Sequence, residues 1–136
     1  LIKNKIPVMG HVGILPQTEK KFSFKGKKLA ERNRILKDAQ LLEKAGIFSV
    51  VLEGVETRLS KLITKTLKIP TIGIGASVYC DGQVLVTDDL IGLSENTFRF
   101  VKKYASTSKL INSAVKKYKS EVIKRQFPKS KHSFKN

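Results

Sequence analysis

Polar residues that could do chemistry follow several short apolar runs of this chain, namely His11, Glu53, Ser77 and Asp88. His11 lies between Gly10 and Gly13, which have no side chains, so its imidazole can face a cavity. The alternative is a histidine that only hydrogen-bonds a neighbouring loop. Glu53 ends an apolar run, where loss of hydration strengthens a carboxylate as a base. The alternative for Glu53 is an ordinary acid at the start of the next helix.

A glycine-containing apolar stretch at residues 69–77 is expected to organise the fold. Pro70 ends the preceding element, because proline disfavours a helical conformation in the residue before it. Gly73 and Gly75 interrupt the apolar run, and a strand keeps glycine where a ligand or another backbone comes close. A core strand that merely contains glycine is the alternative. Residues 84–86 then predict a neighbouring buried strand.

Helices and strands must position these residues. Apolar residues recur at helical spacing over 29–45, with Gly46 as a typical helix stop, and 57–67 predict a second amphipathic helix. Strand-like runs at 6–9, 47–52 and 69–76 alternate with these helices, which implies parallel strands in an α/β fold. The continuous apolar character of 50–52 and 72–74 predicts strands buried on both faces.

The remainder of the chain is expected to be helical. Residues 98–104 form a short apolar stripe, and 110–123 continue as a longer helix with Ser106 or Ser108 as its N-cap. Phe127-Pro128 ends that helix before a polar tail. These patterns divide the chain into a half-barrel over 1–93, a helical segment over 94–127 and a tail over 128–136.

Composition bounds the class of protein. The 136 residues carry a formal net charge of +16, but no nucleic-acid-binding module is evident, so lysines on solvated helix faces are the preferred interpretation. No run approaches the ~20 apolar residues of a membrane span. The start at Leu1 has no apolar signal region, so we expect a piece of a longer, cytoplasmic protein. Cys80 is the one cysteine, and with His11 and His132 it has no zinc-ligand spacing.

Five blocks of the sequence together resemble the ketopantoate hydroxymethyltransferase family of pantothenate and coenzyme A biosynthesis. They are Pro7-Val8-Met9-Gly10-His11-Val12-Gly13 with Pro16-Gln17, Ala45-Gly46 before Val51-Leu52-Glu53, Pro70-Thr71-Ile72-Gly73-Ile74-Gly75-Ala76, Asp81-Gly82-Gln83-Val84-Leu85-Val86, and Phe127-Pro128 with His132-Ser133-Phe134. The resemblance covers essentially the whole chain but only the C-terminal half of the family. It implies the C-terminal half of a (β/α)₈ TIM-type barrel, with about four parallel strands, covering helices and C-terminal helices, because a full barrel needs ~250 residues.

The resemblance also implies a reaction, in which a hydroxymethyl group passes from 5,10-methylenetetrahydrofolate to 3-methyl-2-oxobutanoate and gives 2-dehydropantoate. Mg²⁺ would chelate the keto acid and acidify its C3 proton, Glu53 would remove that proton as the general base, and His11 would bind and orient the substrate. The metal ligands are expected in the family's N-terminal half, and none is assigned to this chain. The chain alone is therefore expected to be inactive, and the full-length protein to be a homo-oligomer.

Departures from the family pattern concern the loops around the site. The family usually has glycine where Ser77 stands and proline where Glu56 stands, and its loop is longer and richer in glycine than residues 18–25 here. Two other functions stay open. One is a different Mg²⁺-dependent enolate enzyme of the phosphoenolpyruvate mutase and isocitrate lyase kind, which would not share the first and fourth blocks. The other is a basic binding protein without catalysis.

The interpretation of the charge as a solvated surface is testable. Lysines of the C-terminal segment fall away from its apolar stripe, as in Lys102, Lys103, Lys116, Lys117 and Lys119. Titration with duplex DNA at ~0.15 M salt should therefore show only weak, sequence-independent binding, because no element reads base edges. Tight, saturable binding to one particular sequence would contradict this interpretation.

Overall fold

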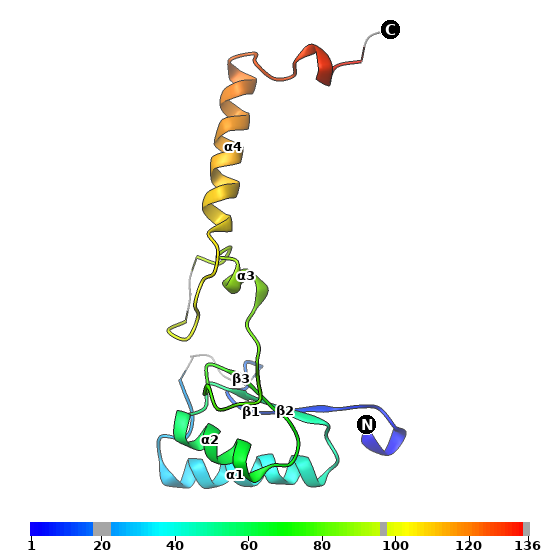
Figure 1. Cartoon of the computed structure of the whole chain (residues 1–136), viewed down its shortest axis with the longest axis vertical. Coiled ribbons are helices and arrows are strands. Elements are labelled where there is room, and N and C mark those ends of the chain that lie inside the picture. Colours follow the sequence, from blue (N-terminus) through cyan, green and yellow to red (C-terminus); the bar gives the residue numbers. More distant parts are fainter. Residues whose placement is uncertain (18–22, 96–97, 135–136) are drawn as a thin grey trace. The chain divides into compact units, whose positions relative to one another are not determined.

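The chain forms two compact units, Leu1–Leu85 and Val86–Asn136, in a computed structural model that describes residues 1–17, 23–95 and 98–134 (Figure 1). The division after residue 93 that the sequence suggested lies within the second unit. The predicted loop over 18–25 falls partly outside the described residues. Within the described part of the chain, no helix has the length and apolar character to cross a membrane.

A parallel sheet forms the centre of the first unit. Its strands are β1 (Met9–Gly13), β2 (Ser49–Glu53), β3 (Thr71–Ile74) and β4 (Gly82–Gln83), and they lie side by side in chain order. Every pairing is parallel, and the register places Glu53 opposite Gly13 on one side and Ile74 on the other. This arrangement confirms the predicted α/β class with four parallel strands and helices.

Two helices supply the crossovers between these strands, and both were predicted from sequence. Helix α1 (Leu29–Lys44) ends before Gly46, whose φ of 92° lies in the left-handed region that glycine adopts at low cost. Helix α2 is Thr57–Thr66. Figure 1 shows both helices on the same face of the sheet, where Ile35, Ala39, Leu59 and Ile63 are buried against the strands. Their apolar stripes thus cover one face of the sheet.

Burial alternates along the strands, as the period of a pleated sheet requires. In β2, Val50 and Leu52 are fully buried toward the helices, whereas Val51 and Glu53 are half-buried on the other face. In β1, Val12 is buried and His11 half-buried in the same way. The prediction of strands buried on both faces is therefore wrong for the described residues, because helices cover only one of the two faces.

Two predicted strands are shifted. The first was placed at 6–9, but β1 begins at Met9, so His11 lies inside the strand rather than after it. The last was placed at 84–86, but β4 ends at Gln83, and Val84 and Val86 are 47% and 55% exposed. Only the Val84 N–H continues the pairing, by donating to the Gly73 carbonyl at 3.0 Å. The first unit ends at Leu85, so the apolar run never enters the sheet.

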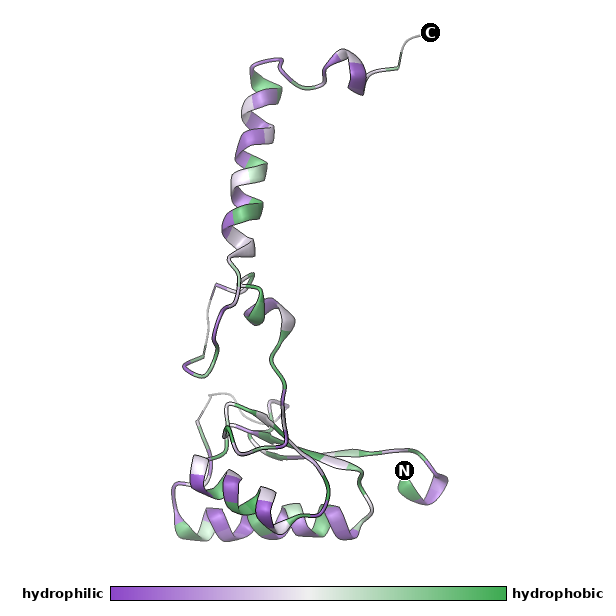
Figure 2. Cartoon of the chain, viewed as in Figure 1, coloured by the Kyte–Doolittle hydropathy of each residue, from purple (hydrophilic) through white to green (hydrophobic). Residues whose placement is uncertain are grey.

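The second unit contains α3 (Thr87–Leu90) and α4 (Thr107–Ile123). Helix α4 begins after Ser106 as predicted, but no side chain caps it; instead the N–H groups of Thr107 and Ser108 donate to the Ile91 and Gly92 carbonyls. Helical structure over 98–104 was a wrong prediction, since the Tyr104 N–H donates to the Leu90 carbonyl rather than to its own segment. Figure 2 shows apolar residues recurring along α4, none of which is buried.

A carboxylate joins the β3 strand to the turn that precedes β4. The Asp81 Oδ2 atom accepts hydrogen bonds from the backbone N–H of Thr71 at 2.8 Å and from its hydroxyl at 2.9 Å. The Thr71 hydroxyl also lies 2.9 Å from that of Thr64 on α2. These bonds from Thr71 hold the pKa of Asp81 below its usual value of 3.8, against the opposing effect of partial burial.

Replacing Asp81 by alanine should destabilise the first unit by about 1–3 kcal/mol, because the fully buried Thr71 would lose its acceptor. Urea-induced unfolding would measure this loss. Asp38→Ala on α1 is the matched control and should cost much less, since the Asp38 side chain is exposed. Equal losses in the two variants would contradict the role of Asp81.

The same contact predicts a pH dependence. The pKa of Asp81 is lowered in the folded state, so its contribution to stability is fully present above the ordinary value of 3.8 and is lost as the pH falls through the folded-state pKa. The free energy of unfolding of the unaltered chain should therefore fall more steeply at acid pH than that of Asp81→Ala.

Candidate active site

His11 and Glu53 meet on the half-buried face of the sheet. Glu53 is paired with Gly13, and His11 lies on the same face of β1 as Gly13 because side chains alternate along a strand. Their side chains therefore lean toward each other across the β1–β2 pair, with His11 Nε2 3.3 Å from Glu53 Oε2. Both predicted site residues are thus brought together at the carboxyl ends of adjacent strands.

The imidazole and the carboxylate are close without being fully engaged with each other. The distance suits an ion pair when the imidazole is protonated, but the alignment is not that of a hydrogen bond, and buried Nε2 has no other hydrogen-bond partner among the described residues. The side chains of His11 and Glu53 are 32% and 19% exposed. A buried nitrogen without a partner is costly, so Nε2 is suited to a polar ligand.

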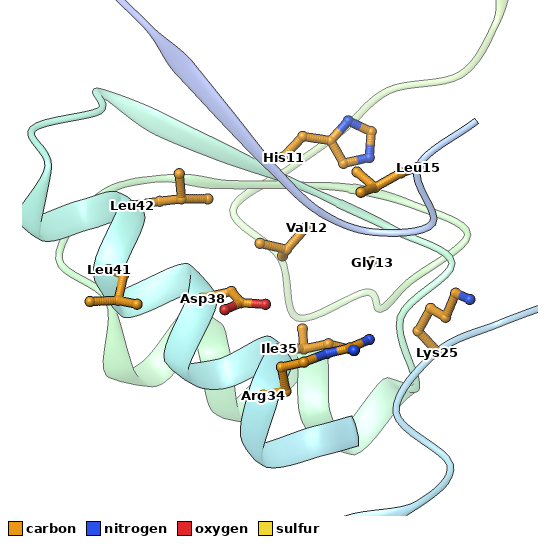
Figure 3. A pocket seen from close by; sticks show the side chains of 10 residues that line it. All are labelled: His11, Val12, Gly13, Leu15, Lys25, Arg34, Ile35, Asp38, Leu41 and Leu42. Atoms are coloured by element: carbon orange, nitrogen blue, oxygen red, sulfur yellow. The ribbon is translucent and has the colours of Figure 1, made fainter. Parts of the chain in front are cut away.

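A cavity of about 630 Å³ lies beside the histidine, between β1 and α1 (Figure 3). Its apolar wall includes Val12 and Ile35, and its charged groups are Lys25, Arg34 and Asp38. Glu53 is not part of this lining. His11 is the residue shared by the cavity and the His11–Glu53 pair.

The other sequence candidates take structural roles. Buried Ser77 accepts a hydrogen bond from the Tyr79 N–H at its hydroxyl and one from the Gln83 amide at its carbonyl. A Cβ on Gly73 would lie 2.9 Å from Gln83 Oε1 and 3.0 Å from Cys80 Sγ, so protein side chains occupy the space that glycine opens. Asp88 lies on α3 in the second unit. The space at Gly73 that the sequence suggested for a ligand is therefore filled by the side chains of Gln83 and Cys80.

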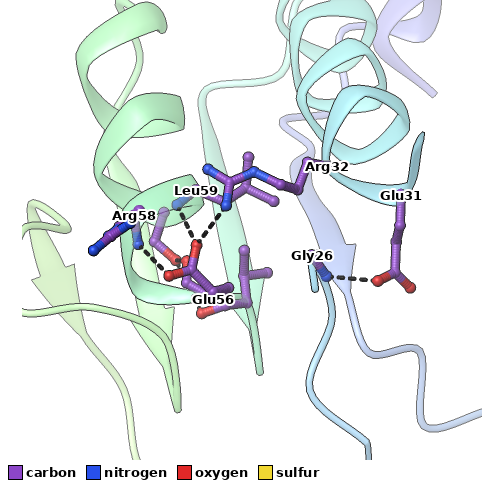
Figure 4. A network of polar contacts seen from close by, with 8 residues as sticks. Gly26, Glu31, Arg32, Glu56, Arg58 and Leu59 are labelled. Atoms are coloured by element: carbon purple, nitrogen blue, oxygen red, sulfur yellow. Dashed lines mark hydrogen bonds and ion pairs between the residues drawn. The ribbon is translucent and has the colours of Figure 1, made fainter. Parts of the chain in front are cut away.

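Glu56 was singled out from sequence only as a departure from a family pattern. It is the N-cap of α2, and its carboxylate accepts hydrogen bonds from the Arg58 and Leu59 N–H groups at 3.0 Å and an ion pair from Arg32 at 3.2 Å (Figure 4). Burial raises the pKa of Glu56, but these hydrogen bonds and the two arginine charges outweigh it and lower that pKa. The residue ties the start of α2 to α1.

The described residues contain no cluster of three metal-ligating side chains. Within 1–17, 23–95 and 98–134, no three His, Cys, Asp or Glu side chains gather as metal ligands. Mg²⁺ takes octahedral oxygen ligands, yet the Asp81 carboxylate is engaged by Thr71 and Glu53 faces a histidine. The expectation that the metal ligands belong to the other half of the family stays a prediction.

Comparison with known proteins identifies the family of this chain. The model of the family described as ketopantoate hydroxymethyltransferase matches residues 1–130. The chain belongs to this family. It is 64% identical over 134 residues to the 3-methyl-2-oxobutanoate hydroxymethyltransferase of Pelagibacter ubique, covering 98% of this chain and 52% of that relative.

Further relatives carry the same printed name. The chain is 48% identical to the protein of Clostridium kluyveri and 47% identical to that of Geobacter metallireducens, covering 50% and 52% of their lengths. The chain thus spans about half the length of the curated relatives it matches. This coverage and the four parallel strands agree with half of a TIM-type barrel, and they give no support to the phosphoenolpyruvate mutase or isocitrate lyase alternative.

The approach of His11 to Glu53 in this ketopantoate hydroxymethyltransferase family member depends on a glycine. Gly13 has a φ of 103°, and a Cβ there would collide with the Glu53 carbonyl oxygen. Gly13→Ala should therefore lower the free energy of unfolding by roughly 1–3 kcal/mol and move β1 away from Glu53. Urea-induced unfolding measures the first effect, and the chemical shifts of the His11 ring protons report the second.

Gly10→Ala is the control in the same strand. Its added Cβ would meet the side-chain end of Ile47 at 2.6 Å, which can move, and its φ is not in the left-handed region. It should cost less than Gly13→Ala and leave the His11 ring shifts nearly unchanged. A greater loss in Gly10→Ala would show that the Gly13 backbone does not set the geometry of the pair.

Proposed function

We propose that this chain supplies the general base and a substrate-orienting histidine to a 3-methyl-2-oxobutanoate hydroxymethyltransferase. The observation that carries the proposal is the 3.3 Å approach of His11 to Glu53 at the carboxyl ends of β1 and β2. Active sites of (β/α)₈ barrels are built at that end of the strands. Family membership and the shared name of the relatives supply the reaction.

Glu53 is suited to take a proton from carbon. Its side chain is 19% exposed, so the carboxylate can reach a substrate on this face of the sheet, and carboxylates are among the side chains that serve as general bases. In the proposed reaction it removes the C3 proton of 3-methyl-2-oxobutanoate, and the electron pair of the broken C–H bond moves into an enolate. Water opens the methylene bridge of 5,10-methylenetetrahydrofolate, so that the one-carbon unit is released as formaldehyde and both folate nitrogens take up a proton in the tetrahydrofolate that leaves. C3 of the enolate then adds to the formaldehyde carbon, and the resulting alkoxide takes up the proton held by Glu53, which gives the hydroxymethyl group.

His11 is assigned a binding role. Its Nε2 atom is buried and lacks a hydrogen-bond partner in the described part of the chain, so a substrate oxygen can satisfy it. Because that atom is 3.3 Å from Glu53 Oε2, a substrate held by His11 lies within reach of the base. Positioning of this kind is what converts a weak base into an effective one.

The metal, the oligomeric state and the location are expected from family membership and not from the side chains described above. Magnesium is expected to act on the keto acid, with its ligands expected in the other half of the family, and no step through the metal is assigned to the described residues. We also expect a homo-oligomer at full length, a cytoplasmic location for this biosynthetic activity, and no specific nucleic-acid partner.

Glu53→Gln should slow exchange of the C3 proton of 3-methyl-2-oxobutanoate with solvent by about 10²–10⁴-fold, because an amide cannot accept that proton. The variant is made in a chimera that carries this chain in place of the matching half of the Pelagibacter ubique relative. Proton NMR of the keto acid in D₂O follows the exchange, and substrate binding should change only modestly. Near-normal exchange would overturn the assignment of the base.

The matched control is Glu43→Gln, which makes the same change at the end of α1, where the carboxylate accepts from the Lys68 N–H at 2.6 Å. It should leave exchange within about twofold of the unaltered chimera, since an amide oxygen still accepts that bond. The chain alone should form no 2-dehydropantoate with or without Mg²⁺. Activity of the chain alone would show that the metal site has been placed in the wrong half.

A further inference from the structure

A second cavity, of about 500 Å³, lies between the loop that precedes α1 and the first turns of that helix. Four cationic side chains and one carboxylate line it, together with the ring of Phe24, which is 45% exposed. The charged residues are Lys25, Lys27, Lys28, Glu31 and Arg34. We call this space the basic cavity. Its excess of cations favours an anionic ligand.

Backbone contacts hold the loop of the basic cavity in place. The Lys25 N–H donates to the Gly54 carbonyl at 2.7 Å, and the Lys25 carbonyl accepts from the Glu56 N–H at 2.9 Å, so the loop forms a parallel bridge just beyond Glu53. Gly26 follows with a φ of 88°, and its N–H donates to Glu31 at 2.7 Å (Figure 4). A Cβ on Gly26 would lie 2.7 Å from Leu59, so only glycine fits there without movement.

This anchoring decides the electrostatics of the basic cavity. Its one carboxylate, Glu31, already accepts the Gly26 N–H, which leaves it less able to neutralise the cations. The ammonium of Lys27 lies 4.0 Å from the centre of the Phe24 ring, which fixes a charge next to an exposed aromatic surface. A ligand with carboxylates attached to an aromatic group matches both features.

The basic cavity and the cavity beside His11 have two lining residues in common. Lys25 and Arg34 line both spaces, and Figure 3 shows their side chains at the end of the His11 cavity away from Leu41. Asp38 also lines the His11 cavity, so the surplus of positive charge grows toward the loop.

We propose that the basic cavity binds the oligoglutamate tail of the folate co-substrate, with Lys27 and Lys28 as its main charged contacts and Phe24 beside the p-aminobenzoyl ring. This proposal rests on the proposed function for the identity of the co-substrate. The cavity itself indicates only the chemical class of a ligand with an aromatic ring and several carboxylates. Each further glutamate adds one negative charge, so a longer tail should bind more tightly.

The test uses p-aminobenzoyl-tetra-γ-glutamate as a probe and isothermal titration of the 136-residue chain. Exchanging both lysines, Lys27→Gln with Lys28→Gln, should weaken binding about tenfold at ~50 mM salt, because exposed charge pairs are screened only partly there. Binding should weaken further at ~0.5 M salt. The monoglutamate form of the probe and tetra-γ-glutamate without the ring should both bind more weakly than the probe.

The matched control removes the same charge elsewhere on α1. Lys37→Gln with Lys44→Gln changes two exposed lysines that do not line the basic cavity, and it should alter binding by less than about twofold. Equal weakening in the two double variants would overturn the proposal, because the probe would then respond to net charge alone. Failure of the probe to bind, or displacement by duplex DNA at equal or lower concentration, would overturn it as well.

Failure of this proposal and failure of the proposed function give different results. Exchange of the C3 proton in the chimera needs no folate, so it tests Glu53 without the basic cavity. Loss of probe binding with normal exchange would remove only the tail site. Normal probe binding with unchanged exchange in Glu53→Gln would remove only the assignment of the base.

Discussion

The parallel register between β1 and β2 is the constraint on which the candidate site depends. It pairs Gly13 with Glu53, and the Ile14 N–H extends the pairing by donating to the Glu53 carbonyl at 2.9 Å. Since side chains alternate along each strand, this register alone decides that His11 and Glu53 share a face. A slip by one residue would turn one of them toward α1, so the chemistry depends on backbone hydrogen bonds as much as on the two side chains.

The helices α1 and α2 cover the face of the sheet opposite to the His11–Glu53 pair. The residues that stabilise the first unit therefore lie on one face of the sheet, and the candidate site residues lie on the other. The core of the first unit includes side chains that are at most 1% exposed, namely Val50, Leu52, Leu59 and Ile63. Within the described part of the first unit, no helix lies over the face that carries Glu53 (Figure 1). In a closed barrel that face would be the interior, where substrates reach the carboxyl ends of the strands.

Local pattern predicted the helices and the parallel topology, and it singled out the two candidate site residues that the structure brings together. Periodicity located α1 and α2 because each buries one stripe, and the ends of apolar runs located His11 and Glu53. It failed at 84–86 and 98–104, where apolar side chains are exposed and hydrogen bonds between distant backbone groups decide the structure. The ion pair between Glu56 and Arg32 could not be predicted either, because Arg32 is distant in sequence.

The order of the strands in the sheet is the same as their order in the chain, and this has a consequence for how the protein is made. Each strand pairs with the one synthesised just before it, so every step of sheet growth joins neighbours in sequence and closes only a modest loop. The first unit can thus assemble one βα segment at a time as it leaves the ribosome, with α1 settling once β2 has arrived. No strand needs to wait for a distant partner before it finds its place.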